Sequence, residues 1–330
     1  MIMGRKIRTL HVPGSIHTET DADAPTVIDL FSGCGGLSAG FAMAGFRVIA
    51  GFDSWAPAVE SYRASLDGNA CLLDLSHADE AVREMDRLGI PRTEGIVGGP
   101  PCQDFSSAGK RSEGARADLT AQYARIVLAR RPSFFLMENV ARAKGSKAFA
   151  TATGMLSEGG YGIITRVLDA SLCGVPQKRK RLITIGVSDR SVEDVDGTVG
   201  RALDEGLADH PLTMRGRFGS SLGIDRFYRH PRSYARRGIF SMDEPAPTVR
   251  GVNRPVPPGY KPHKGDAGPV EGTRALTTTE RALVQTLDGF TIVGTKTQME
   301  QQIGNAVPPM LARYAAKAIA DSLYPAGGRS

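Results

Sequence analysis

The sequence predicts an α/β fold, a parallel sheet covered by helices on both faces, with a smaller and mostly irregular second lobe. Two observations predict it. From Thr26 onward, short apolar runs alternate with glycine turns and helical stretches, which is typical of a parallel sheet. Near residue 189 the composition changes, and an acid-rich stretch at 191–210 precedes an arginine-rich one. A chain of 330 residues can bury a large core in two lobes.

The expected elements follow one another in order. Residues 1–24 are polar, and we expect a loosely ordered tail. Short apolar runs predict strands and 3.6-residue periodicity predicts helices, with Pro57 suited to a first helical turn. The expected strands are Thr26–Phe31, Arg47–Phe52, Ile96–Gly98, Phe134–Met137, Ile163–Leu168 and Leu182–Val187, and the expected helices are Leu37–Ala44, Pro57–Leu66, Tyr123–Ala129, Thr279–Leu287 and Val307–Leu323.

Charge and cysteine usage bound the function. The net charge of +6 is a mild indication of a polyanionic partner. The four cysteines have neither disulfide-like nor metal-like spacing, and no apolar signal segment is present, so we expect reduced thiols in a cytoplasm and no metal. No apolar run approaches the ~18 residues of a membrane span, so no membrane partner is expected.

Cys102 follows the expected strand at Ile96–Gly98, directly after two prolines. Prolines fix the backbone before the sulfur, which suits a nucleophile that must be aimed, and loops at strand ends carry chemistry in such folds. The alternative is a small buried hydrophobe, because free cysteine is usually buried and inert. This segment alone leaves both interpretations open.

A glycine turn at Asp29–Leu37 follows one strand and opens a helix. Glycines let the backbone approach a ligand, and a helix N-terminus supplies free N–H groups. Asp53 ends the next strand, where an acid can accept hydrogen bonds from ribose hydroxyls. The turn lacks the dinucleotide spacing and a Walker lysine, so it indicates a nucleoside cofactor or a mere tight turn. Asp74 could meet an adenine amino group or cap a helix.

Five motifs occur in order. They are Asp29–Gly36, Pro101-Cys102-Gln103 with Phe105-Ser106, Glu138-Asn139-Val140, Gln177-Lys178-Arg179-Lys180-Arg181 and Gln302–Pro309. In this order and spacing the chain resembles the DNA (cytosine-5) methyltransferase family over roughly residues 26–187 and 272–322. The resemblance implies a Rossmann-like S-adenosylmethionine-dependent methyltransferase sheet with a smaller, mostly irregular target-recognition domain.

The resemblance also divides the chain. It implies an N-terminal tail at 1–24, the main part of the catalytic domain at 25–188, a target-recognition domain at 189–271 and a C-terminal return to the catalytic domain at 272–330. The compact size suggests a bacterial or phage enzyme, in a restriction–modification system with a separately encoded endonuclease or acting alone. We expect a monomer in the bacterial cytoplasm or nucleoid.

The implied reaction moves the methyl group of S-adenosyl-L-methionine to carbon 5 of a cytosine, leaving S-adenosyl-L-homocysteine. Cys102 would add to carbon 6 as a thiolate, and Glu138 would hydrogen-bond ring nitrogen 3 and the exocyclic amine. Arg179 and Arg181, two apart on one strand face, would hold the carbonyl oxygen of the base and nearby phosphates. The cytosine must flip out of the duplex to be reached. A surface ion pair at Glu138 and a solvated edge at the arginines are the alternatives.

The cofactor is expected between the first and last motifs. The residues implied around it are Phe31, Gly33, Gly35, Gly36, Asp53, Trp55, Asp74, Pro100 and Asn305. The family's ribose-binding acid is usually a glutamate followed directly by a large apolar residue, whereas here Asp53 precedes Ser54 and then Trp55. Trp55 is expected either to stack on the adenine or to pack against the following helix.

Two stretches are expected to contact duplex DNA. Between Pro211 and Arg237, seven arginines face one acid, Asp225, which exceeds what a solvated surface needs. The interleaved aromatic residues could instead form the core of a small lobe. The expected contacts are Gln103, Ser106, Lys110 and Arg111 after the nucleophile, Arg215, Arg217, Arg229, Arg232, Arg236 and Arg237 in the arginine stretch, and Thr248 beyond it. An ordinary surface loop is the alternative for the first group.

Three other functions remain open from the sequence. A transfer-RNA cytosine-5 methyltransferase of the same fold would carry the same catalytic motifs. A catalytically inactive relative would bind DNA without methylating it, although Cys102 and Glu138 speak against this. A nicotinamide-dependent oxidoreductase is disfavoured because the dinucleotide fingerprint is missing.

Overall fold

The structure is a computed structural model that describes residues 7–16, 21–66, 69–101, 119–231, 233 and 236–325. Its strands are β1 (Arg8–His11), β2 (Thr26–Leu30), β3 (Arg47–Asp53), β4 (Asn69–Leu72), β5 (Gly95–Gly98), β6 (Phe134–Val140), β7 (Tyr161–Asp169), β8 (Gln177–Lys178), β9 (Lys180–Ser188), β10 (Arg226–Tyr228), β11 (Ile239–Ser241), β12 (Ala246–Pro247), β13 (Arg274–Ala275) and β14 (Thr291–Gly294). Its α-helices are α1 (Gly36–Met43), α2 (Ala56–Ser65), α3 (Ala78–Arg87), α4 (Leu119–Arg130), α5 (Lys147–Glu158), α6 (Val192–Val195), α7 (Arg201–Glu205), α8 (Met214–Phe218), α9 (Thr278–Val284), α10 (Lys296–Asn305) and α11 (Pro309–Leu323). Shorter helical segments are η2 (Ala141–Gly145), η3 (Ala170–Leu172) and η4 (Asp196–Gly200).

The central sheet has seven strands in the order β4-β3-β2-β5-β6-β9-β7, which confirms the expected α/β class. The strands β2 to β6 run parallel to their neighbours, but β9 is antiparallel to both β6 and β7. The expected parallel pairing holds from β4 to β6, whereas the β6-β9-β7 edge of the sheet is antiparallel. A parallel crossover needs a dozen or more residues, usually a helix, and only 170–179 join β7 to β9. The chain therefore turns straight back and inserts β9 between its neighbours.

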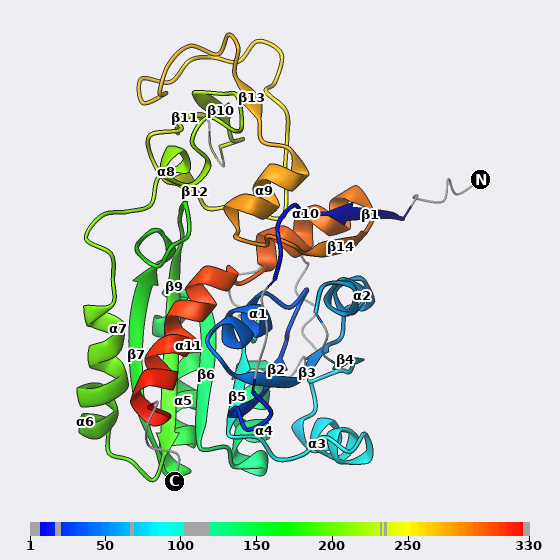
Figure 1. Ribbon diagram of the computed structural model, residues 1–330, viewed down its shortest axis with the longest axis vertical. Helices are drawn as coiled ribbons and strands as arrows, with labels where there is room; N and C mark the ends of the chain where they lie inside the picture. The colour runs from blue at the N-terminus through cyan, green and yellow to red at the C-terminus, as the bar shows by residue number, and fades with distance from the viewer. Residues whose placement is uncertain are drawn as a thin grey trace.

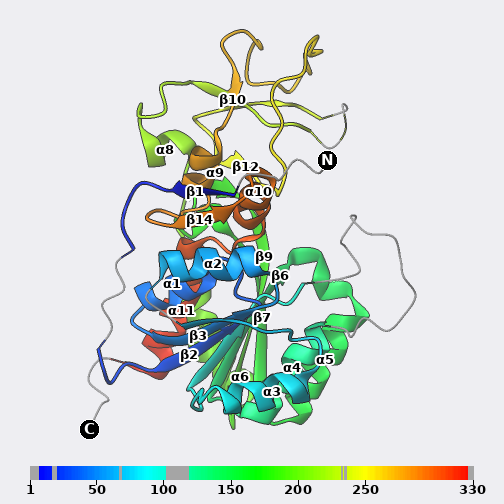
Figure 2. The same ribbon diagram turned by 90° about the vertical axis from the view of Figure 1, so that its right-hand side faces the viewer.

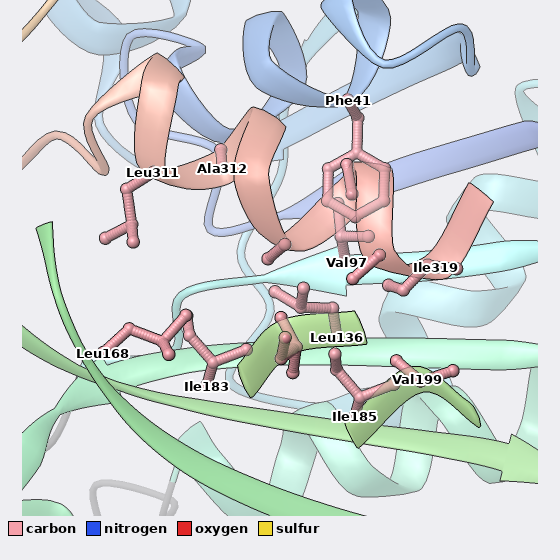
Figure 3. Packing of buried hydrophobic residues seen from close by; sticks show 14 of the residues in the cluster. Phe41, Val97, Leu136, Leu168, Ile183, Ile185, Val199, Leu311, Ala312 and Ile319 are labelled. Atoms are coloured by element: carbon pink, nitrogen blue, oxygen red, sulfur yellow. The ribbon is translucent and has the colours of Figure 1, made fainter. Parts of the chain in front are cut away.

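Helices cover both faces of this sheet (Figure 2). On one face, α1 and α11 bury apolar side chains against the sheet, and Figure 3 shows Phe41, Leu311 and Ile319 directed at Leu136 and Ile183. On the other face, α3, α4 and α5 cover the second side of the sheet. Strands buried on both faces read as continuous apolar runs, which is why β5 and β6 lack alternation.

The N-terminal segment is not entirely a loose tail. Arg8–His11 form β1, which pairs antiparallel with β14 near the other end of the chain, and Val12 is buried. The pairing partner lies about 280 residues away, so no local pattern could indicate it. Within the described residues, no helix is both long and apolar enough to cross a membrane.

The second lobe lies at the upper end of the molecule (Figure 1). Its small sheet has the order β11-β10-β13, and β12 pairs with β8 where the two lobes meet. Phe227 and Phe240 stack in its interior with ring centroids 5.9 Å apart, and Tyr228 is also buried. The alternative that aromatic residues of the arginine stretch form a core is thus correct for Phe227 and Tyr228. Most of 249–273 has no regular structure.

Candidate active site

A cavity of about 680 Å³ opens where β2, β3, β5 and β6 end. Open α/β sheets bind ligands in the crevice outside the carboxyl ends of their strands. The cavity brings together residues of all five motifs, including Pro101, and expected site residues that lie between them. The expected site residues among its lining are Phe31, Gly33, Asp53, Trp55, Asp74, Pro100, Glu138, Arg179, Arg181 and Asn305.

The glycine turn enters the cavity with two left-handed residues. Phe31 has a φ of 59° and Gly33 a φ of 55°. A bulky residue rarely adopts this conformation, so Phe31 is held there by its surroundings. A Cβ atom at Gly33 would meet no protein atom within 4 Å, so this face of the turn is open to a ligand.

Gly35 and Gly36 were expected to bind the cofactor, but neither lines the cavity. Gly35 has a φ of 97°, and a Cβ atom there would lie 2.6 Å from a methyl carbon of Leu66. A Cβ atom at Gly36 would overlap the carbonyl oxygen of Val307. Both glycines therefore allow close packing of the turn against α2 and the C-terminal segment.

Asp53 braces the glycine turn. Its Oδ2 accepts a hydrogen bond from the Gly33 N–H at 2.9 Å, and its Oδ1 accepts one from the Trp55 N–H at 2.8 Å. Burial raises the pKa of the Asp53 carboxyl, and the backbone hydrogen bonds oppose the rise. Each carboxylate oxygen has a further lone pair available for a ligand hydroxyl. Trp55 is half-buried beside it at the start of α2.

Asp74 and Asn305 lie at the rim of the cavity. Asp74 is exposed, and its Oδ1 accepts a hydrogen bond from the Ser76 N–H at 2.9 Å. The cap residue of α3 is His77, so Asp74 shapes the preceding turn and is not the cap itself. Asn305 is exposed at the last position of α10.

Glu138 and Arg181 form an ion pair deep in the cavity, with Nε 2.8 Å from Oε1. Their side chains are only 11% and 13% exposed, so the alternative of a surface ion pair does not describe Glu138. The acid comes from β6 and the arginine from the adjacent antiparallel β9. The pair presents a carboxylate and forked donors side by side to anything that enters.

Asn139 was not singled out from the sequence. Its Nδ2 donates to the Pro100 carbonyl at 3.0 Å, while its Oδ1 accepts from the Val140 N–H at 2.8 Å. It thereby fixes the end of the turn that leads to Cys102. Its position beside the motif acid was the only available signal.

Arg179 does not face the cavity as an equal partner of Arg181. It is 2% exposed, and its guanidinium donates to the carbonyls of Val249, Gly304 and Ala306, each at 3.1 Å. Burial, with a contribution from nearby Arg181, lowers its pKa to about 9. Both arginines line the cavity as expected, but Arg179 is not on a strand, because it lies between β8 and β9 where the strand is interrupted.

Two buried glutamines complete this junction, and neither was singled out from the sequence as a junction residue. Gln177 donates through Nε2 to Gln285 at 2.6 Å and accepts from the Val249 N–H at 2.8 Å. Gln285 donates to the Ile303 carbonyl at 2.5 Å. The available signal for Gln285 was its polar side chain at a position of the expected helix Thr279–Leu287 where the helical pattern calls for an apolar one.

Three expected DNA contacts are already paired with acids. Arg215 contacts Asp225 and Asp243, Arg217 contacts Asp288, and Arg237 contacts Glu244 and lies over the Phe240 ring. The comparison of seven arginines with one acid was misleading, because most of these acids come from outside residues 211–237.

The remaining expected contacts are placed as follows. Arg236 is exposed. Arg229 is half-buried and donates to the Thr248 carbonyl at 3.1 Å, and the Thr248 hydroxyl donates to the Lys178 carbonyl at 2.9 Å. Outside the described residues lie Cys102, Gln103, Ser106, Lys110, Arg111 and Arg232. Across the described part of the chain, no group of three or more His, Cys, Asp or Glu side chains could hold a metal ion.

Known proteins match this chain over most of its length. The family model for C-5 cytosine-specific DNA methylases matches residues 25–199 and 222–321. The type II methyltransferase M.HgiDI of Herpetosiphon aurantiacus is 51% identical over 294 residues, covering 88% of this chain and 93% of the relative. The type II methyltransferase M.HindV of Haemophilus influenzae is 47% identical over 296 residues, covering 88% and 95%.

Solved structures show the same fold at low sequence identity. A structure described as a DNA modification methyltransferase encoded within an Escherichia coli prophage has a TM-score of 0.64 at 23% identity, covering 91% of this chain and 99% of that one. The Dnmt2 methyltransferase of S. pombe has a TM-score of 0.59 at 17% identity, covering 92% and 100%.

Proposed function

This chain belongs to the C-5 cytosine-specific DNA methylase family, and from that premise we propose how its residues perform the reaction. The protein is a DNA cytosine-5 methyltransferase of the kind found in type II restriction–modification systems. The family uses S-adenosylmethionine and acts on DNA. The residue roles below are our proposal.

The residues at one end of the cavity fit S-adenosylmethionine. The open face of Gly33 allows close approach, and the Asp53 carboxylate is braced where ribose hydroxyls would donate. The half-buried Trp55 provides an aromatic surface for an adenine. When bound, the cofactor supplies a methyl group activated on a sulfonium. Asp74 and Asn305 would contact its polar edges from the rim.

Glu138 and Arg181 would receive the flipped cytosine at the other end. The carboxyl group would bond ring nitrogen 3 and the exocyclic amine, and the guanidinium would donate to the carbonyl oxygen of the base. The ion pair holds both side chains in place before the base arrives, so little reorganisation is needed. Arg179 supports this end by fixing the surrounding backbone.

Cys102 would attack carbon 6 of the base as a thiolate, which makes carbon 5 nucleophilic. Asn139 and the two prolines would aim it, because the Asn139 side chain anchors the Pro100 carbonyl two residues earlier. After methylation, loss of the carbon 5 proton and release of the cysteine would restore the aromatic ring. The observation that carries the proposal is the single cavity that contains both Gly33 with Asp53 and Glu138 with Arg181.

A duplex carrying 5-fluorocytosine at the target position tests the mechanism. Fluorine cannot leave as the proton does. In the presence of S-adenosylmethionine, the wild-type enzyme should therefore accumulate a covalent adduct between the protein and the DNA. Cys102→Ser should form no adduct and transfer no methyl group, while binding the cofactor normally. Cys71→Ser, at a half-buried thiol in β4, is the matched control and should form the adduct. Adduct formation by Cys102→Ser would disprove the assignment.

We further propose that residues 189–271 act as the target-recognition domain, between catalytic parts at 25–188 and 272–330. We also infer a monomeric enzyme in the bacterial cytoplasm that acts beside a separately encoded endonuclease. The type II methyltransferase relatives support the restriction–modification setting. Size-exclusion chromatography of the free enzyme and of its DNA complex tests the monomer.

A further inference from the structure

The segment 73–78 joins β4 to α3 and passes along the catalytic cavity beside Asp53. Leu73 and Asp74 line the cavity. At the first residue of the segment, the Leu73 N–H donates to the Asp53 carbonyl at 3.0 Å. At its last residue, Ala78, α3 begins. The position of Asp74 therefore depends on what holds these two ends.

The start of α3 is capped by a side chain from another helix. Helix N-termini leave N–H groups without intrahelical partners, and a cap usually comes from the preceding residue. That residue is His77, whose side chain makes no cap bond within the described residues. Instead, the Ala78 N–H donates to Oε1 of Gln122 in α4 at 2.9 Å. Gln122 is only 7% exposed and Ala78 is buried, so water cannot readily replace this acceptor.

The helix α4 connects this cap with the cavity. Leu119 and Gln122 are three residues apart, so they lie on the same side of α4. Leu119 lines the cavity, while Gln122 bonds the start of α3. The two helices pack against each other (Figure 2), and Leu75 is buried in the same apolar cluster as Ala78 and Tyr123. Gln122 therefore holds the far end of the segment against a helix that borders the cavity.

The carboxyl group of Asp74 is placed by the segment that carries it. Asp74 is exposed, and its Oδ1 accepts a hydrogen bond from the Ser76 N–H within the same segment at 2.9 Å. This bond moves with the segment and does not tie it to another element. The two anchors that do so are the bonds made by Leu73 and Ala78.

We propose that Gln122 is a positioning residue for the cofactor, which holds the start of α3 so that Asp74 meets the exocyclic amino group of the adenine. This inference rests on the proposed function, in which Asp74 contacts the cofactor from the rim. Gln122 is not among the described residues that line the cavity, so it acts through the backbone. Its effect falls on cofactor affinity, because Glu138 and Arg181 are carried by other strands.

Gln122→Met and Gln122→Glu form the test. Methionine keeps the length of the side chain without the acceptor oxygen, whereas glutamate keeps an acceptor whose charge suits a helix N-terminus. Titration calorimetry of S-adenosylhomocysteine without DNA measures the Kd. Gln122→Met should raise the Kd about tenfold, because a buried N–H loses its acceptor. Gln122→Glu should stay within about threefold of the wild type.

Methyl-transfer kinetics provide a second measurement. The KM for S-adenosylmethionine should rise with the Kd in Gln122→Met, while kcat should fall less than about twofold. A loss confined to kcat would place Gln122 in the chemical step and contradict its role in cofactor affinity.

A double-mutant cycle with Asp74→Ala tests the route of the effect. Asp74→Ala alone should also raise the Kd, and adding Gln122→Met should then raise it little further, because both changes remove the same contact. An analogue of S-adenosylhomocysteine with purine in place of adenine lacks the amino group, so it should bind the wild type and Gln122→Met alike. A tenfold loss that persists in the Asp74→Ala background would mean that Gln122 serves the fold and not the adenine contact.

The matched control is Ser191→Ala. The Ser191 hydroxyl caps α6 by accepting from the Asp194 N–H at 3.1 Å, and α6 packs beside β7, at the opposite edge of the sheet from β4 (Figure 1). The variant loses a helix cap, so its urea midpoint should fall while its Kd stays at the wild-type value. A wild-type Kd in Gln122→Met, or equal weakening in Gln122→Glu, would overturn the assignment. A wild-type protein that does not bind S-adenosylhomocysteine would instead contradict the proposed function, so the two failures are distinguishable.

Discussion

Asp29 lies beneath the glycine turn with its carboxyl group fully buried. Its Oδ2 accepts hydrogen bonds from the N–H of Ser38 at 3.1 Å and from its hydroxyl at 2.6 Å, and that hydroxyl accepts from Tyr62 at 2.9 Å. Its Oδ1 has no hydrogen-bond partner among the described residues. Burial raises the pKa of the Asp29 carboxyl to about 7, although the bonds from Ser38 oppose the rise.

Asp29→Asn should reduce the pH dependence of stability. The unfolded chain releases the Asp29 proton near pH 4 and the folded chain near pH 7. The folded state therefore holds the extra proton in between, and its stability falls as pH rises through this window. Asparagine has no such proton. Between pH 5 and pH 8, the free energy of unfolding of the wild type should therefore fall by about 2–3 kcal/mol relative to that of the variant.

Urea unfolding at pH 5 and pH 8 measures this difference. Asparagine can still accept both bonds from Ser38, so a general loss of packing is not expected. The comparison between the two pH values also cancels any constant cost of the substitution. If the free energy of unfolding changed equally with pH in the two proteins, Asp29 would be ionised in the folded state from pH 5 to pH 8, which would contradict the prediction.

At the scale of elements, one polar junction joins the lobes. Its side chains are Gln177 of β8, Arg179 of the β8–β9 break and Gln285 at the end of α9. Gln177 and Arg179 bond the backbone of Val249, and Arg179 and Gln285 bond carbonyls at the end of α10. Buried carbonyls need donors, and here a few side chains supply them beside the short β8–β12 ladder. The junction therefore fixes where the recognition lobe begins relative to the cavity.

Arg179→Met should destabilise the fold by about 2–4 kcal/mol. Methionine keeps much of the volume and relieves the cost of burying a charge, but it removes the Arg179 donor from the carbonyls of Val249, Gly304 and Ala306, of which Ala306 keeps a bond from Gln285 at 3.3 Å. We expect the lost donors to dominate. Arg166→Met is the control, because Arg166 makes only part-exposed pairs with Asp196 and Asp204, and it should cost under about 1 kcal/mol.

Urea midpoints of the two variants decide this prediction. If Arg179→Met and Arg166→Met lost the same small amount of stability, water would have replaced the Arg179 side chain as the donor at the junction. Methyl transfer should also fall in Arg179→Met, since the backbone around Glu138 and Arg181 loses its support.

At the scale of the whole molecule, the two ends of the chain close the fold. β1 pairs with β14, and α11 crosses α1 on one face of the sheet (Figure 1). The crossing is close because Gly40 lacks a side chain. A Cβ atom there would lie 2.6 Å from both the Arg313 nitrogen and the Pro309 oxygen. The last motif thereby lies against the first.

Gly40→Ala should destabilise the protein by about 1–3 kcal/mol, because the added methyl forces α1 and α11 apart. Gly154→Ala in α5 is the control. A Cβ atom at Gly154 would meet nothing within 4 Å, so alanine there should stabilise the helix by about 0.5–1 kcal/mol. Thermal unfolding compares the two, and a stabilising Gly40→Ala would contradict the close crossing.

Much of the site was predictable because its signals are local. Asp53 is the last residue of β3 and Glu138 lies two residues before the end of β6, and parallel strands bring their ends to one edge. Asn139 and the buried glutamines were missed because their partners, backbone groups and in one case each other's side chains, are distant along the chain. The burial of Arg179 against three carbonyls was missed for the same reason, although it lines the cavity as expected.

The sequence by itself determined the family, the acids that line the cavity and most strands and helices of the main lobe, since periodicity and motifs depend on neighbouring residues, although β4, α3 and α5 were not expected. Only the tertiary structure decided the antiparallel insertion of β9, the burial of Arg179 and the neutralisation of Arg215 and Arg217. Asp243 and Asp288 reach those arginines through space. Charge balance and burial depend on distances between side chains, and those distances follow from the fold and not from separation along the chain.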